Sequence, residues 1–278
     1  MSLFALHLAA SLGAVLTFNP PVEPSVHPGP TPVGAPPAHA APARPTVNAS
    51  EALTRLHAGH ARFLTQEPLA PRQSLHRVAE TAAGQHPFAA ILTCSDSRVP
   101  PEILFDQGFG DLFVIRVAGN VAGADELGTL EYGVGHLGIG LIVVLGHSKC
   151  GAVTAAVDGG EAPGSIPALL KQIQPAVVRT RAAHPRAGKE ELVAHAISSN
   201  VWVATESILV RSDEIARSLA DNKVRVVGAI YDVSTGQIQW LGPHPRQGQL
   251  ASRVRLNGGT AKVGVAQVEP ATEPGHQP

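Results

Sequence analysis

The sequence predicts an α/β fold with a mostly parallel central sheet, helices on both of its faces and an antiparallel strand at its C-terminal edge. Apolar runs at residues 88–93 and 141–145 are typical of parallel strands buried on both faces, and residues 112–117 are expected to form a further strand. Stretches with helical spacing separate these runs, and such alternation favours a parallel sheet. Residues 223–230 and 237–241, joined by a glycine-containing turn, predict the closing antiparallel pair.

Helical segments are expected between and around the strands. The first follows an Asn48/Ser50 cap and runs to Leu64, and a turn-rich connection with Pro68 and Pro71 then leads to the first strand. A short helix should follow Arg98, where prolines are acceptable in the first turn. The remaining helical segments are expected at 125–137, from 151 onward, at 166–182 and at 190–219.

The composition limits the class of protein. A chain of 278 residues can hold one large domain or two small ones, and its 44% hydrophobic but only 4% aromatic residues imply an aliphatic core. The formal charge is -1 and no basic cluster stands out, which argues against a nucleic-acid partner.

The N-terminal segment, residues 1–46, is expected to lie outside the fold. Residues 3–18 are apolar and uncharged, with the length of a secretory signal, and Ala38-His39-Ala40 has the form of a cleavage site. Residues 20–45 are rich in Pro, Ala and Gly, as in a disordered linker. These features predict export to the periplasm or beyond, with no membrane span in the mature chain. A misassigned start codon would instead make the protein cytoplasmic.

Residues 47–256 are then expected to form the catalytic domain, and residues 257–278 a loose tail. Chemically reactive residues gather at two places in this domain. Cys94-Ser95-Asp96-Ser97-Arg98 follows one predicted strand and Gly146-His147-Ser148-Lys149-Cys150 follows another. Open α/β sheets bind ligands at the carboxyl ends of their strands.

Cys94, His147 and Cys150 form a ligand set that suits zinc, and three protein ligands leave a fourth position open, as a catalytic site requires. They include both cysteines of the chain, so a Cys94–Cys150 disulfide is the alternative for an exported protein. Two thiolates and one imidazole neutralise the charge of zinc, which predicts activity that rises toward alkaline pH.

Asp96 and Arg98 are expected to form a catalytic pair. Asp96 is close enough to ligate the metal or to accept a hydrogen bond from the metal-bound hydroxide, and an ionised carboxylate selects a protonated oxygen. The planar guanidinium group of Arg98 can pair with the Asp96 carboxylate and so hold it away from the metal. Loss of that pairing would let Asp96 take the fourth position and close the site. Nearby, Gly119 lies in a loop suited to bringing backbone close to a small ligand.

Three segments resemble the β-class carbonic anhydrases: Cys-Ser-Asp-Ser-Arg-Val at 94–99, Leu-Phe-Val-Ile-Arg-Val-Ala-Gly-Asn at 112–120 and Gly-His-Ser-Lys-Cys-Gly at 146–151. The resemblance covers nearly all of the predicted domain. It implies a β-carbonic-anhydrase-like fold and a homodimer or homotetramer. It also implies a zinc enzyme that interconverts carbon dioxide and bicarbonate.

Residue by residue, the resemblance implies that Cys94, His147 and Cys150 hold Zn²⁺ and that Asp96 and Arg98 are the catalytic dyad. It further implies that Asp96 becomes the fourth ligand only in the closed resting state. Gln107 is similar to the family's glutamine that helps to bind substrate across the dimer interface.

Tyr231 and Arg116 match two residues of a bicarbonate site that inhibits one branch of the family, whereas Ile91 stands where that branch has tryptophan. We therefore expect the open form of the site at neutral pH.

Two other functions remain open from the sequence. The same nucleophile could hydrolyse carbonyl sulfide or carbon disulfide, which are also small, linear and electrophilic at carbon. A catalytically silent zinc- or anion-binding domain is the second alternative, although such a domain has no evident need for both Asp96 and Arg98.

Overall fold

The computed structural model describes residues 47–257 of the chain. The predicted leader and linker, residues 1–46, lie outside the described residues, and so does the predicted tail apart from its first residue, Asn257.

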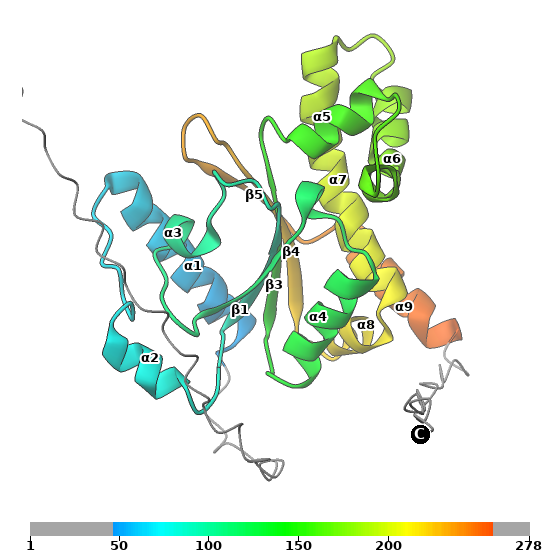
Figure 1. Cartoon of the computed structure of the whole chain (residues 1–278). Helices are drawn as coiled ribbons and strands as arrows, with labels where there is room; N and C mark the ends of the chain where they lie inside the picture. Colours follow the sequence, from blue (N-terminus) through cyan, green and yellow to red (C-terminus); the bar gives the residue numbers. More distant parts are fainter. Residues whose placement is uncertain (1–46, 258–278) are drawn as a thin grey trace, which may run out of the picture. The chain divides into compact units, whose positions relative to one another are not determined.

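The predicted sheet is present, with five strands in the order β2-β1-β3-β4-β5 (Figure 1). The first four are parallel, and β5 is antiparallel to β4, as the sequence predicts. The strands are β1 (Ala89–Thr93), β2 (Leu112–Arg116), β3 (Leu141–His147), β4 (Arg225–Tyr231) and β5 (Ile238–Gly242).

The helices are α1 (Ala49–Thr65), α2 (Leu75–Thr81), α3 (Pro101–Leu104), α4 (Ala124–Gly135), α5 (Gly151–Asp158), α6 (Ile166–Ala183), α7 (Lys189–Arg211), α8 (Asp213–Ala220) and α9 (Gln247–Asn257), with a short 3₁₀ turn, η1, at Ala118–Asn120. The first begins as predicted, since Asn48 Oδ1 accepts a hydrogen bond from the Glu51 N–H at 2.9 Å. Among the described residues, none of the helices has both the length and the apolarity needed to cross a membrane.

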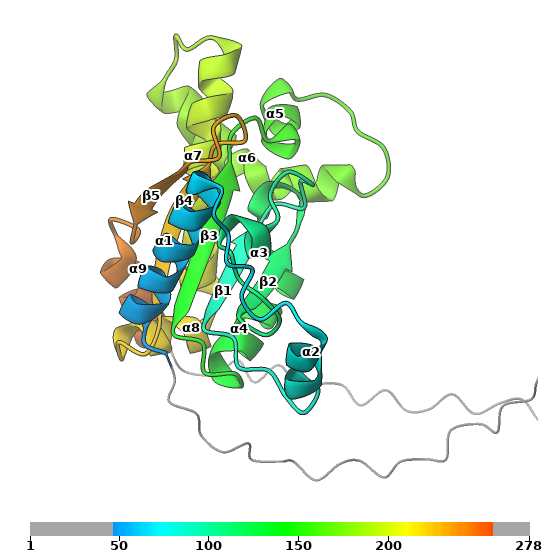
Figure 2. The same cartoon turned by 90° about the vertical axis from the view of Figure 1, so that its left-hand side faces the viewer.

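Helices cover both faces of the sheet, which explains the apolar runs of the fully buried strands β1 and β3, whereas the edge strand β2 is only partly buried (Figures 1 and 2). Alternate side chains of β1 point to opposite faces. Ala89 and Ile91 pack in the core that includes residues of α1 and α3, whereas Ala90 and Leu92 pack in the core that includes α4, α7 and α8. A third apolar cluster, at the carboxyl ends of the strands, joins α5, α6 and the N-terminal half of α7 around the two cysteines.

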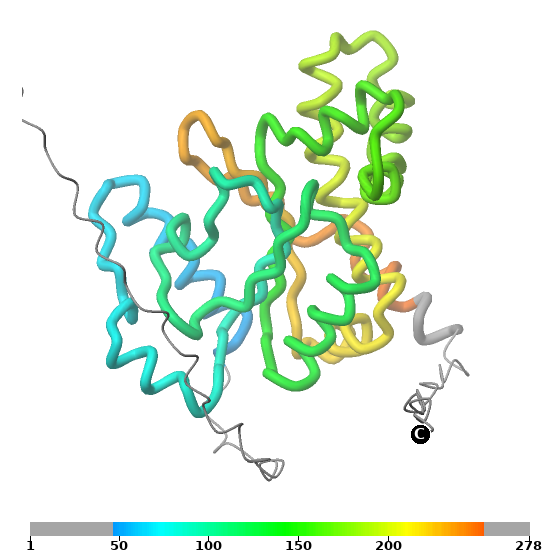
Figure 3. The backbone as a smooth tube through the Cα atoms, viewed as in Figure 1, coloured from blue at the N-terminus to red at the C-terminus, as the bar shows by residue number. Residues whose placement is uncertain are grey.

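One predicted helix is divided in the structure, and two helices are present that the sequence does not predict. The predicted helical stretch at 190–219 is broken at Ser212, which has extended backbone angles and whose Oγ accepts a hydrogen bond from the Ile215 N–H at 3.2 Å, starting α8. The connection after Pro71 contains α2, which starts at a Ser74 cap and buries none of its residues. The chain also continues past β5 into α9, which lies beside α7 and α8 (Figure 3).

A charge cluster on Glu206 fixes the segment after β5 to α6 and α7. Glu206 accepts hydrogen bonds from Arg179 at 2.7 Å and Arg246 at 3.1 Å, and His244 Nε2 lies 3.3 Å from its Oε1. Burial would raise the pKa of Glu206, but the hydrogen bond from Arg179 and the surrounding positive charges hold it below its ordinary value. Burial also lowers the pKa of His244.

Candidate metal centre

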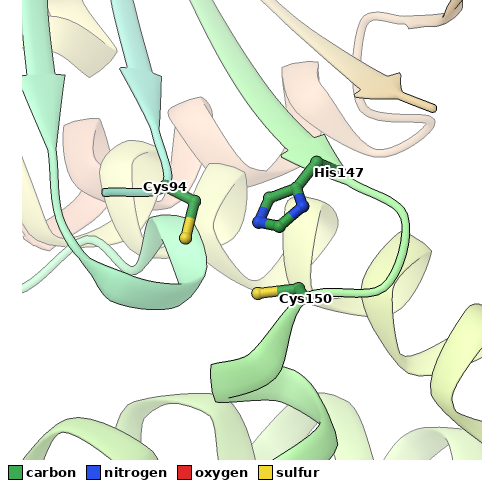
Figure 4. A group of neighbouring side chains, drawn as sticks. All are labelled: Cys94, His147 and Cys150. Carbon is green, nitrogen blue, oxygen red and sulfur yellow. The ribbon is translucent and has the colours of Figure 1, made fainter. Parts of the chain in front are cut away.

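Cys94, His147 and Cys150 converge at the carboxyl edge of the sheet, where their side chains point toward one another (Figure 4). Cys94 directly follows β1, His147 is the last residue of β3, and Cys150 caps α5. Because β1 and β3 are adjacent parallel strands, both segments emerge at the same edge. The Thr93 hydroxyl joins these strands by donating a hydrogen bond to the Leu145 carbonyl at 2.8 Å.

The geometry of this group fits a metal ion. One donor atom from each residue lies within 4.8 Å of the other two, and all three residues are buried. His147 Nδ1 is 2.9 Å from the Ser148 carbonyl, which assigns the proton to Nδ1 and leaves Nε2 facing the two sulfurs. Among the described residues, Nε2 has no hydrogen-bond partner although it is buried. A buried nitrogen without a hydrogen-bond partner destabilises the folded state, and coordination of a metal ion would supply the missing partner.

Both cysteines are free thiols. The disulfide alternative is therefore not the state of this structure. A hydrogen bond from Cys150 lowers the pKa of Cys94, although burial opposes the shift. The pKa of Cys150 is raised because it holds the proton that Cys94 shares. Two sulfurs and one imidazole nitrogen form a donor set suited to Zn²⁺, and three ligands leave a tetrahedral position open.

Asp96 and Arg98 form a bidentate ion pair beside Cys94, His147 and Cys150. Arg98 Nε donates to Asp96 Oδ1 at 2.9 Å, and Nη2 donates to Oδ2 at 2.7 Å. Hydrogen bonding from Arg98 holds the pKa of Asp96 well below its usual range, so the carboxyl group is ionised. Its Oδ2 lies 3.9 Å from His147 Nε2. The carboxylate is thus next to the three donors while Arg98 holds it.

Two further contacts shape the loop that carries Cys94. The Arg116 guanidinium donates to the backbone carbonyls of Cys94 and Asp96. The Gly119 N–H donates to Cys94 Sγ at 3.2 Å. Gly119 has a φ of 72°, and a Cβ there would come within 2.7 Å of Ile173 Cδ1, so the position requires glycine.

Asn200 of α7 makes a contact that the sequence does not predict. It is 1% exposed, and its Nδ2 donates to the Gly119 carbonyl at 2.7 Å. The available signal was one asparagine whose positions one helical turn before and after it, Ala196, Ile197, Val203 and Ala204, are apolar.

Gln107 lies in a different environment. It is buried, its Nε2 donates to the Phe105 carbonyl at 2.8 Å, and it packs near Gly59 of α1. Within the chain, these contacts direct its side chain amide toward α1.

Tyr231 stands opposite His147 in the parallel register of β3 and β4. Its backbone carbonyl accepts a hydrogen bond from the Ser148 N–H at 2.8 Å. Its ring belongs to the core on the α1 face, together with Ile91, and burial raises the pKa of its phenol.

Comparison with known proteins places these residues in a family. The family model described as "Carbonic anhydrase" matches residues 89–238. A carbonic anhydrase of Mycolicibacterium smegmatis is 39% identical over 199 residues, which cover 70% of this chain and 94% of that protein. Carbonic anhydrase 2 of Mycobacterium tuberculosis is 38% identical over 197 residues, covering 69% of this chain and 93% of the relative.

Solved structures of β-carbonic anhydrases have the same fold as this chain. The β-carbonic anhydrase CafA of Aspergillus fumigatus superposes with a TM-score of 0.60 and 25% identity, covering 76% of this chain and 99% of that one. One of two tetrameric β-carbonic anhydrases of Sordaria macrospora gives a TM-score of 0.53 and 27% identity, covering 69% of this chain and 96% of that one.

Proposed function

This chain belongs to the β-class carbonic anhydrases, which interconvert carbon dioxide and bicarbonate, and we propose that it does so with a zinc ion held by Cys94, His147 and Cys150. The observation that carries the proposal is the convergence of three buried donor atoms within 4.8 Å, one of them a nitrogen with no partner among the described residues. A zinc ion bound there supplies a Lewis acid that lowers the pKa of water.

The roles proposed for Asp96 and Arg98 follow from their charge and hydrogen bonds. An ionised carboxylate only accepts hydrogen bonds, so Asp96 selects a protonated attacking oxygen and orients it toward carbon dioxide. Arg98 fixes the carboxylate through two parallel hydrogen bonds. If that pair opens, Asp96 is near enough to become the fourth ligand and close the site.

We further propose that the chain works as a dimer or a multiple of dimers, with Gln107, Gly119 and Tyr231 assisting substrate binding. Tetrameric relatives of the same fold support this assembly. Large apolar side chains are also exposed here: Leu69 and Leu75 are 70% and 86% exposed, and Phe109, whose N–H donates to the Arg72 carbonyl between them at 3.0 Å, is 50% exposed. Analytical ultracentrifugation tests the assembly, and a monomer across the micromolar range would refute it.

Export is a separate proposal that rests on residues 1–46 alone. Its apolar segment and the Ala38-His39-Ala40 site predict a mature chain that begins near residue 41 and lies in the periplasm or outside the cell. N-terminal sequencing of the protein from its native host distinguishes this from an intact cytoplasmic chain.

The decisive experiment is stopped-flow hydration of carbon dioxide by the full chain, with zinc content measured on the same sample. We expect about one zinc per chain and a rate that rises toward alkaline pH. Asp96 stays ionised throughout that range, so the rise does not report its titration. Full zinc content without turnover at alkaline pH would refute carbon dioxide hydration.

A further inference from the structure

Asn200 is the buried polar residue of α7 that reaches the metal centre. The buried residues around it on the helix are Ala196, Ile197, Val201 and Ala204. Asparagine is a poor helix former, and burying its amide among apolar groups is costly unless a hydrogen bond compensates. Its Nδ2 makes that bond at 2.7 Å, to the Gly119 carbonyl.

Gly119 in turn contacts a proposed ligand directly. It lies in the left-handed turn of η1, and its N–H donates to Cys94 Sγ at 3.2 Å. The turn is fixed on its β2 side, where the Val117 N–H donates to the Thr93 carbonyl at 3.1 Å. On its other side, the hydrogen bond from Asn200 fixes the Gly119 carbonyl.

A hydrogen bond to a thiolate sulfur withdraws electron density from it and so weakens its donation to a metal. We propose that Asn200 is a positioning residue of the metal centre: by fixing Gly119, it keeps the Gly119 N–H on Cys94 Sγ and sets how strongly that sulfur donates to the zinc ion. The inference deepens the proposed function, because it rests on Cys94 being a metal ligand.

The test replaces Asn200 with leucine, which has a similar size and cannot donate a hydrogen bond. Zinc affinity is measured by competition with a chromophoric chelator, and the sulfur-to-cobalt charge-transfer band is recorded on the Co²⁺-substituted full chain. Asn200→Leu should weaken zinc affinity roughly 10- to 100-fold, because Gly119 and Cys94 are then no longer held in position for the ion, and this loss of positioning outweighs the stronger donation from the sulfur. It should also move the charge-transfer band to lower energy, since the sulfur becomes more electron-rich.

Thr205→Val is the matched control. Thr205 lies on the same helix, is 0% exposed, and its hydroxyl donates within the helix to the Val201 carbonyl at 2.8 Å. This variant should leave the band and the zinc affinity at wild-type values. Equal changes in the two variants, or an Asn200→Leu protein with wild-type values, would overturn the proposal.

If Asn200→Leu does not fold, Asn200→Ser takes its place. Its short hydroxyl does not span the distance bridged by the amide, so the same shifts are expected, and their absence overturns the proposal. Neither measurement needs turnover of carbon dioxide. A wild-type protein that binds zinc without hydrating carbon dioxide would refute the proposed function and still leave this inference open to test.

Discussion

Asp96 and Glu206 are two carboxylates of similar exposure in very different surroundings. Their side chains are 18% and 14% exposed, respectively. Glu206 is surrounded by Arg179, Arg246 and His244, which fix α9 and the preceding segment to the helices beneath. Asp96 is held by the single side chain of Arg98 and faces an imidazole nitrogen that has no hydrogen-bond partner among the described residues.

The difference separates a structural charge cluster from a chemical site. Around Glu206, one carboxylate is paired with two guanidinium groups and an imidazole, and among the described residues neither Glu206 nor His244 has a buried side-chain atom without a hydrogen-bond partner. At the metal centre, the donors are gathered and buried, and one of them, His147 Nε2, has no hydrogen-bond partner among the described residues. A buried nitrogen without a partner that converges with two sulfurs is therefore the better guide to function here than the number of charges.

The largest effect should come from removing the donor with incomplete bonding. His147→Ala leaves two sulfurs, and zinc content should fall to near zero with hydration at the uncatalysed background rate. Elemental analysis and stopped-flow kinetics on one preparation test this. A variant that retains both zinc and turnover would contradict the assignment of His147 as a ligand.

Asp96→Asn should retain zinc but lose roughly 100-fold or more in turnover, because the amide can donate where the carboxylate only accepted. The same two measurements test it. Loss of zinc together with turnover would instead mean that Asp96 has a ligand role in the working enzyme.

Glu206→Gln should have the opposite profile, with turnover per zinc unchanged and stability reduced. The expected loss is about 1–2 kcal/mol, since the change leaves positive charges uncompensated while the partner arginines are half exposed to water. Urea unfolding followed by circular dichroism measures it. A fall in turnover at full zinc content would contradict the distinction between a structural carboxylate at Glu206 and a catalytic one at Asp96.

The smallest effect concerns pH. The pKa of His244 is lowered in the folded chain, so the unfolded chain takes up its proton first as pH falls below about 6.5, and stability declines. The pKa of Glu206 is also lowered, so its contribution is present above its ordinary pKa and is lost as pH falls further, through its folded value. His244→Asn removes the titrating ring, so the loss of stability between pH 7 and pH 5 should be smaller than in the wild type, as measured by thermal unfolding.

The parallel sheet and the three proposed ligands could be predicted because each depends on a local pattern. A strand buried on both faces is a continuous apolar run, and donors placed just after adjacent parallel strands must meet. The short helix α2 was missed because it buries none of its residues, and Leu75 is 86% exposed. The break between α7 and α8 depends on one capping serine inside an otherwise continuous helical pattern.

The contacts that orient the ligands could not be predicted in the same way. The hydrogen bond from Asn200 to Gly119 joins segments far apart in the chain, and nothing near either residue specifies the other. The resemblance matches Arg116 to a residue of a bicarbonate site in one branch of the family, but it gives no sign that the guanidinium holds the carbonyls of the Cys94 loop. Such partners become visible only once the strands and helices are placed.

Thr93, the residue before Cys94, donates a hydrogen bond to the Leu145 carbonyl, and this bond affects how the metal ion enters the site. It ties β1 to β3 with no metal involved, so the conformational entropy of gathering the donors is lost when the sheet forms and not when the ion arrives. The site is thus preorganised, and the apoprotein should keep its secondary structure after chelation. Reloading it with zinc should be a fast, local event without a refolding phase, in contrast to small zinc domains that fold only around their ion.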